Sequence, residues 1–182
     1  TNAAIIGRAG VTPSVVLQDI AQNTEFFATF AKEGGDNILR AAIAAKSLGS
    51  ELGTVSGIAE SLLDFESSIE AQLEASLLLG RQINLDRARQ LFFVGKTEQG
   101  LLEVLKQVGS EAEFTRLLPI QRQKLASAVG LNVEQLSRLV RNNATGATGA
   151  AVGAAMGGDG QSVDFLSQIA DNTRKTYKGI QG

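Results

Sequence analysis

The chain has 182 residues, 43% of them hydrophobic and 20% charged, and its formal net charge of −2 gives no electrostatic reason to expect direct nucleic-acid binding. It contains no Cys, which excludes disulfides and thiolate metal sites, and no His, which removes the commonest proton-transfer group and metal ligand. Because Trp is absent and the aromatic residues are eight Phe and one Tyr, small aliphatic side chains must dominate any core.

The N-terminal part of the chain carries start and stop signals for two helices. Thr12 followed by Pro13 is an N-cap and first-turn signal, which predicts a helix over about 13–33. A pair of glycines ends that helix. Asp36 then caps a second apolar run, which predicts a helix over 38–48.

The next stretch is the most regular amphipathic pattern in the chain. Thr54 opens it, and it predicts a single helix over about 54–81, which at 1.5 Å per residue would be about 40 Å long. Apolar or small side chains recur there at helical spacing, interrupted by Gln72, so they share one seam that requires a partner helix. The seam consists of Ile58, Leu62, Phe65, Ile69, Ser76 and Leu79.

Residues 85–141 are predicted to form short helices packed into a bundle. Ser110 with Glu113 three residues later fits a capping box, and Pro119 is placed to start a new helix. A last helix of the bundle is predicted over 133–141. The other expected caps are Asn84, Thr97 and Asn132.

Residues 142–161 change composition abruptly. They contain six Gly and few large side chains, so backbone entropy opposes a fixed helix and the segment is interpreted as a flexible tether. Gly149, Gly153 and Gly157 have a spacing that also allows a close helix crossing or a membrane-active element. The tether is the favoured interpretation of the three.

After the tether, Ser162 can cap a terminal amphipathic helix. Its apolar stripe is too short to make a stable isolated helix in water, so it requires a surface to dock on. The stripe consists of Val163, Leu166 and Ile169, extended by Thr173 and Tyr177.

The predicted fold class is therefore all-α, with long amphipathic helices and a short-helix bundle, extended and oligomeric rather than a closed globular domain. No alternating strand pattern is present. The chain divides into an N-terminal helical segment at 1–53, the long helix plus short-helix bundle at 54–141, the tether at 142–161 and the terminal docking helix at 162–182.

Four motifs in this order resemble the C-terminal region of tail tape measure proteins of contractile-tailed bacteriophages. The resemblance runs from about 15 to 140, nearly without gaps. The motifs are LLDFESSIEAQLEASLLLGR (Leu62–Arg81), INLDRAR (Ile83–Arg89), GLLEVLKQVGSEAEF (Gly100–Phe114) and IQRQKLASAVGLNVEQL (Ile120–Leu136).

The resemblance implies a structural virion protein in the tail tube lumen, docked on the baseplate hub. Such a segment contributes to tail assembly, tail length determination and DNA ejection. The implied partners are sister copies, most simply in a homotrimer, together with hub and tail tube proteins. The implied location is the virion, after assembly in the host cytoplasm, with membrane contact only on ejection.

The apolar pattern also predicts which side chains contact partners. Adjacent Phe residues on a helix point about 100° apart, so one member of a pair can face outward and anchor an interface. The predicted interface residues are Leu62, Phe65, Ile69, Phe92, Phe93, Val163, Leu166 and Ile169.

Charged clusters in the same region are interpreted as solvated or ion-paired side chains and not as functional sites. Glu66, Glu70 and Glu74 share one helix face, where a solvated or salt-bridged role is favoured over a metal site, because a di-iron bundle would also need His. Arg81 and its neighbours Arg87 and Arg89 are expected to pair with carboxylates or helix C-terminal carbonyls, with contact to an acidic tail protein as the alternative.

No catalytic motif, cofactor site or metal site is predicted. The chain has no GxSxG elbow or SxxK motif to place a nucleophile beside its activator. Two rival classes stay open: a helical-bundle scaffold or adaptor protein unrelated to phage tails, and an enzyme whose acidic residues converge only in the fold.

Overall fold

The computed structural model describes residues 10–144, and within this range the chain forms helices and no strand, so the all-α class is confirmed. The helices are α2 (Pro13–Gln22), α3 (Thr24–Phe30), the 3-10 helix η1 (Glu33–Gly35), α4 (Asp36–Ser47), α5 (Leu52–Leu63), α6 (Phe65–Leu79), α7 (Asp86–Phe93), α8 (Thr97–Val108), α9 (Glu111–Arg116), α10 (Pro119–Ala128) and α11 (Val133–Ala144).

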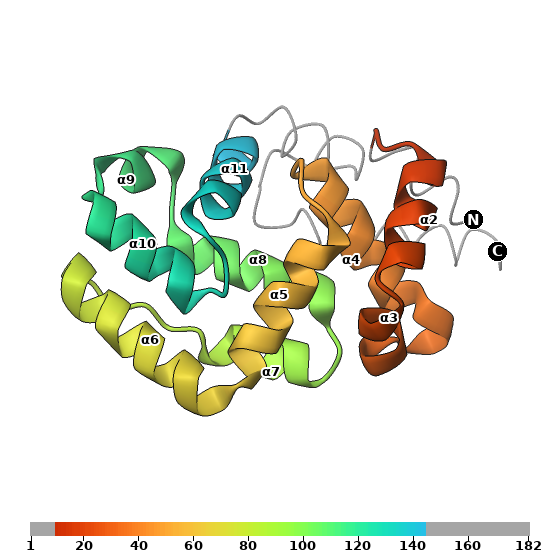
Figure 1. Cartoon of the computed structure of the whole chain (residues 1–182), viewed down its shortest axis with the longest axis horizontal. Coiled ribbons are helices and arrows are strands. Elements are labelled where there is room, and N and C mark those ends of the chain that lie inside the picture. The colour runs from red at the N-terminus through yellow and green to blue at the C-terminus, as the bar shows by residue number, and fades with distance from the viewer. Residues whose placement is uncertain (1–9, 145–182) are drawn as a thin grey trace, which may run out of the picture.

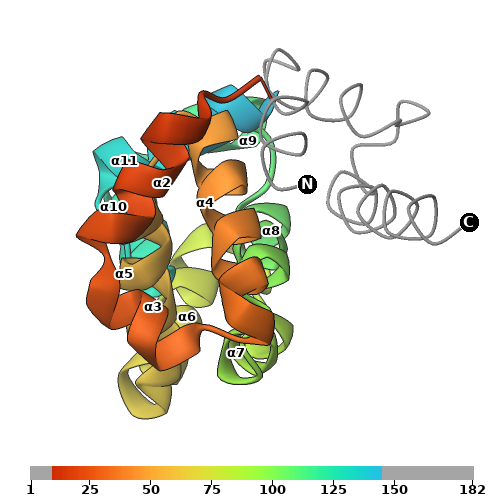
Figure 2. The ribbon, with the colours of Figure 1, turned by 90° about the vertical axis from the view of Figure 1, so that its right-hand side faces the viewer.

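The helices pack around α4, α5 and α8. Figure 1 shows α2 and α3 at one end of the molecule and α6, α9 and α10 at the other. Helix α4 contacts both α2 and α8, and Figure 2 shows it lying between them. Helix α6 packs mainly on α10, and α7 packs on α5 and α8. Residues far apart in the sequence thus share one hydrophobic core.

Small aliphatic side chains fill this core, as the composition predicts. In α4, Ala41, Ala42, Ala44 and Ala45 are fully buried, because the helix has neighbours on several sides. Phe92 is the largest fully buried side chain, and its ring lies against Gly100, where a Cβ atom would approach within 2.7 Å. That glycine therefore allows α7 and α8 to pack closely.

Several predicted helix boundaries are confirmed. Ser110 and Glu113 form the expected capping box, with a hydrogen bond in each direction. Pro119 occupies the first turn of α10. The backbone N–H of Gln135 donates to the Asn132 side chain at 2.8 Å, so this residue caps α11 as predicted.

The predicted first helix is wrong in its extent. Asn23, with φ −118° and ψ 49°, separates α2 from α3, and its side chain donates to the Asp19 carbonyl at 2.7 Å. Asp19 itself is buried, and its carboxylate accepts from the Leu52 backbone N–H at 2.7 Å and pairs with Lys46 at 3.4 Å. Buried polar groups need such partners, so Asp19 binds α2 to α4 and α5.

The predicted 40 Å helix over 54–81 is also wrong. The chain leaves helical geometry at Asp64, where ψ is 82°, so α5 and α6 are separate helices. The Asp64 carboxylate accepts the Ser67 hydroxyl at 2.9 Å. Short polar side chains compete locally with the helix backbone in this way, and a periodic apolar pattern does not reveal the competition.

The expected segment boundaries shift as well. Helix α5 runs across the boundary placed between 53 and 54, and the core draws side chains from both sides of it. Asn142 and the two residues after it, assigned above to the tether, belong to α11, and the Asn142 side chain donates to the Leu48 carbonyl at 2.7 Å. The rest of the tether, with its three spaced glycines, and the terminal segment 162–182 lie outside the described residues.

The neighbouring Phe92 and Phe93 provide a test of this packing. Phe92→Ala should lower the free energy of unfolding by about 3–5 kcal/mol, because it leaves a cavity against Gly100. Phe93→Ala should cost far less, since its side chain is 70% exposed. Urea unfolding of both variants checks this, and equal losses would contradict the placement of the two rings.

Candidate interaction surface

A buried arginine sets the rotation of α6 about its own axis. Arg89 of α7 is 4% exposed, and its guanidinium donates to the Ser68 hydroxyl at 3.0 Å and to the Gln72 side-chain oxygen at 2.8 Å, both on α6. It also pairs with Asp86 at 2.7 Å. The polar side of α6 therefore faces the rest of the molecule at this point.

The electrostatics explain why this side faces inward. Burial lowers the pKa of Arg89, and Asp86 opposes the shift. A guanidinium that loses water needs hydrogen-bond acceptors, because an unpaired buried charge is far more costly than an exposed apolar side chain. Ser68 and Gln72 are one turn apart on α6 and supply two of these acceptors.

The same rotation leaves an apolar row on the outside of α6. Phe65, Ile69, Leu73 and Leu77 recur every fourth residue and are between 46% and 83% exposed. Phe93 extends the row, because its ring lies 6.4 Å from that of Phe65. These five side chains are called the α6 row below. Large apolar side chains gathered in this way mark an interaction surface.

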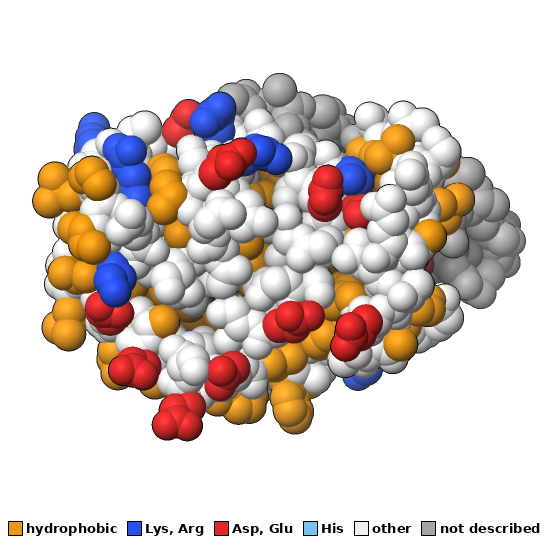
Figure 3. Space-filling view, viewed as in Figure 1, with side chains coloured by type: hydrophobic (Ala, Val, Ile, Leu, Met, Phe, Trp, Pro, Cys, Tyr) orange, Lys and Arg blue, Asp and Glu red, His pale blue; other side chains and the backbone are white. Residues whose placement is uncertain are grey.

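An acidic row runs beside it on the same helix. Glu66 and Glu70 form no ion pair within residues 10–144, whereas Glu74 pairs with Lys124 of α10 at 2.8 Å. Figure 3 shows acidic side chains over α6 along the lower edge and apolar side chains at the end where α6, α9 and α10 lie. Among the described residues no group of three carboxylates is placed to hold a metal ion.

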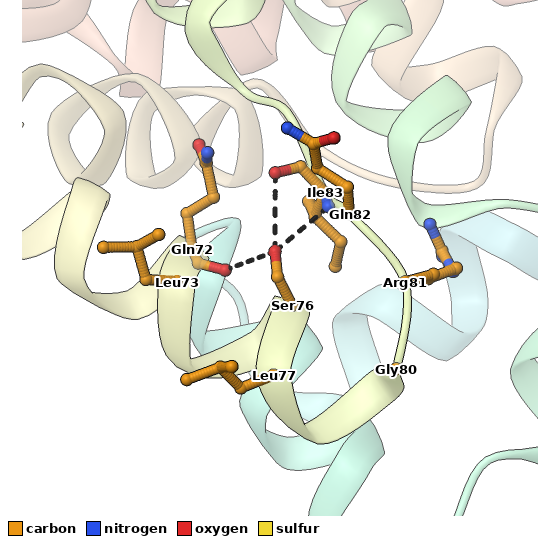
Figure 4. Close-up of a pocket in the computed structure, with 8 residues that line it drawn as sticks. All are labelled: Gln72, Leu73, Ser76, Leu77, Gly80, Arg81, Gln82 and Ile83. Carbon is orange, nitrogen blue, oxygen red and sulfur yellow. Dashed lines mark hydrogen bonds between the residues drawn. The ribbon is translucent and has the colours of Figure 1, made fainter.

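A shallow pocket of about 320 Å³ lies between α6 and the loop that follows it. Figure 4 shows how hydrogen bonds hold the loop against the helix: the Ser76 hydroxyl donates to the Gln72 carbonyl at 2.8 Å and accepts from the Ile83 backbone N–H at 3.0 Å. Leu73 and Leu77 of the α6 row line this pocket. The α6 row thus continues into this pocket, which polar side chains such as Gln72 and Gln82 also line.

The structure separates the predicted interface residues into three groups. Leu62 and Phe92 are fully buried within the chain, so their prediction as partner contacts is corrected: they pack in the core. Phe65, Ile69 and Phe93 lie on the α6 row. The remaining three, Val163, Leu166 and Ile169, lie outside the described residues.

Sequence reasoning missed Leu73 and Leu77. Their four-residue spacing from Phe65 and Ile69 was visible, but the predicted seam ran through Ser76 and Leu79 instead. The exposure of Leu73 and Leu77, together with the contacts of Arg89 on the other side of α6, shows which face is outward.

The other two arginines of the predicted cluster, Arg81 and Arg87, form contacts within the chain. Arg81 donates to the carbonyls of Gln107 and Val108 at the C-terminal end of α8, at 3.0 and 2.7 Å. Arg87 lies 3.9 Å from Glu103. Both contacts lie within the chain, as the sequence predicts for these arginines.

A second, more polar pocket lies at the other side of α8. The pocket has a volume of about 440 Å³, and Glu98, which is 7% exposed, lines it together with Arg40 and Asp36. Burial raises the pKa of Glu98 to about 8, which Arg40 opposes and Asp36 reinforces. Asp36 is itself paired with Arg40 at 2.6 Å. The carboxyl of Glu98 therefore carries a proton at neutral pH.

Hydrogen bonds of polar side chains connect the two loops that line this pocket. Lys32 donates to the Val94 carbonyl at 2.6 Å, and Asn37 donates to the carbonyls of Phe30 and Gly95 at 2.7 and 2.8 Å. Lys96 lines the same pocket. These bonds hold the loop before α4 against the loop between α7 and α8.

No protein-family model, curated protein or solved structure matches this chain. Within residues 10–144, no helix has both the length and the apolar content to cross a membrane.

The role of Arg89 can be tested by substitution. Arg89→Met should lower the free energy of unfolding by about 1–3 kcal/mol, because Ser68 and Gln72 lose their donor in a buried setting. Arg87→Met, at an exposed position, should change it by less than about 0.5 kcal/mol. Denaturant titration distinguishes them, and an unaffected Arg89 variant would contradict the proposed rotation of α6.

The protonated state of Glu98 predicts a pH dependence. Its folded pKa lies above its unfolded value, so the folded state binds the proton more tightly and stability falls as pH rises from about 4.5 through about 8. Glu98→Gln should remove this loss, and its stability relative to the natural chain should grow with pH. Unfolding curves of the two chains between pH 5 and 8 measure the difference, and a difference that stays constant with pH would contradict the raised pKa of Glu98.

Proposed function

We propose that this chain is a structural segment of a phage tail tape measure protein, taken from its C-terminal part. The four sequence motifs of Leu62–Leu136 support the proposal by resemblance. The single structural observation that carries it is the α6 row: a helical domain that already has a closed core exposes a regular apolar stripe. Such a stripe is suited to assembly with other helical segments.

In this proposal the segment sits in the tail tube lumen at the end nearest the tip, where it docks on the baseplate hub. Several copies associate, most simply as a homotrimer, and the oligomer is extended along the tail axis. The parent protein contributes to tail assembly, tail length determination and DNA ejection. The role is structural and requires no cofactor.

The alternative is a helical scaffold or adaptor protein unrelated to phage tails. The α6 row fits this class too, because an adaptor also needs a surface for its partner. The two differ in partner: the tail protein associates with copies of itself and with the hub, whereas an adaptor is a monomer that binds another protein. For an enzymatic role, the Glu98 pocket is the candidate within residues 10–144, because Glu33, Asp36 and Glu98 line it together.

Substitution of the α6 row tests the proposal. Ile69→Asp should weaken self-association by about 10- to 100-fold, since burying one such side chain contributes about 1.5–3 kcal/mol, and should leave helix content unchanged. Light scattering on the isolated chain measures its mass, and assembly of tails in infected cells provides a second readout.

Leu17→Asp is the matched control. Leu17 is also an exposed apolar residue, but it lies on α2 at the opposite end of the molecule (Figure 1). Its substitution should leave association and tail assembly intact. A monomeric natural chain, or tails that assemble normally with Ile69→Asp, would favour the adaptor.

A further inference from the structure

The charges beside the α6 row limit what can cover it. If two copies of α6 packed parallel along the row, Glu66 and Glu70 of one copy would lie beside the same residues of the other. If they packed antiparallel, these carboxylates would lie near Glu74 of the other copy, whose charge is already paired with Lys124. Neither Glu66 nor Glu70 has an ion-pair partner within residues 10–144 to offset that repulsion. The row therefore suits a helix that combines an apolar stripe with basic residues.

The terminal segment 162–178 of this chain has that combination in its sequence. Its apolar residues span about 21 Å if helical, close to the about 18 Å from Phe65 to Leu77. Basic residues lie in its C-terminal part. They are Arg174, Lys175 and Lys178.

The charge pattern also selects an orientation. The free carboxylates of α6, Glu66 and Glu70, lie toward its N-terminal end, and cationic Lys124 lies beside its C-terminal half through Glu74. The basic residues of the terminal segment lie toward its C-terminal end, and its two acidic residues, Asp164 and Asp171, precede them. An antiparallel arrangement places opposite charges together at both ends. It also places Tyr177 near the aromatic pair of Phe65 and Phe93.

We propose that the α6 row of one copy binds the terminal segment 162–178 of a sister copy, antiparallel to α6. Seventeen residues, 145–161, separate this segment from α11, and an extended chain of that length spans about 55–60 Å. That reach is enough to cross to a neighbour. The contact joins two different surfaces, and such a heterologous contact forms a ring such as a trimer when the rotation between copies closes.

This inference rests on the proposed homo-oligomer, and it names the contact that builds it. Exchange of the terminal segment leaves each folded core unchanged, because the α6 row lies outside that core. Association then depends on one apolar stripe and a few charges.

The chain contains no Cys, so any disulfide must form between the introduced cysteines. A chain with Leu73→Cys and a differently tagged chain with Leu166→Cys are co-expressed and then oxidised with diamide, which accepts the two electrons released as the thiols form a disulfide. The Leu73 substitution does not touch the core, since that side chain is exposed. The expected major product is a mixed disulfide between the two tagged chains. Leu17→Cys replaces Leu73→Cys as the control and should give only traces.

A second pair tests orientation and charge. Leu77→Cys should join Val163→Cys and not Tyr177→Cys. Replacing Glu66 and Glu70 with Lys should lower the yield of the mixed disulfide by roughly two- to fivefold, the range expected for exposed ion pairs.

Three results would overturn the proposal. Disulfide dimers of Leu73→Cys alone would show that α6 pairs with itself. A disulfide within a single chain carrying both substitutions, without mixed product, would show that the segment covers its own α6. Absence of either product in chains that light scattering shows to be oligomeric would assign the row to another partner and leave the proposed oligomer standing, whereas a monomeric mass would count against the oligomer itself.

Discussion

The buried guanidinium of Arg89 is the constraint on which the outer surface of this protein depends. A charged group removed from water must find acceptors, and α6 offers Ser68 and Gln72 on one side. Satisfying that group turns the helix so that its more apolar side faces solvent. The free energy that the domain could have gained by burying Phe65 and Ile69 is left available for association.

The side chains that stabilise the fold are different from those of the α6 row. The core is built from the alanines of α4, the aliphatic side chains of α5 and α8, and Phe92, and it is closed without the α6 row. The row can therefore bind and release a partner without unfolding the domain. In the proposed assembly, each copy folds before it associates.

Polar side chains make the connections between helices that the small aliphatic core cannot specify. Asp19 holds the start of α5, Asn142 reaches the end of α4, and Asn37 joins two loops beside Glu98. Alanine and valine surfaces pack in many similar ways, whereas a buried hydrogen bond is formed in one geometry only. Glu98 differs from Asp19 because it forms no ion pair within residues 10–144, and burial raises its pKa although Arg40 lies in the same pocket.

The sequence by itself determined the all-α class, the aliphatic core and the helix starts at Ser110, Pro119 and Asn132, because capping and periodicity depend on neighbours a few residues away. It also identified Phe65, Ile69 and Phe93 as candidates for contact. Only the tertiary structure decided that the chain breaks at Asp64, that Phe92 is buried while Phe93 is exposed, and that Leu73 and Leu77 join the outer row. The outward position of Leu73 and Leu77 depends on Arg89, about 20 positions further along the chain, meeting Ser68 and Gln72. Phe92 is buried because it lies against Gly100 of α8. A local pattern cannot predict such contacts, because the partners are brought together only by the packing of other helices.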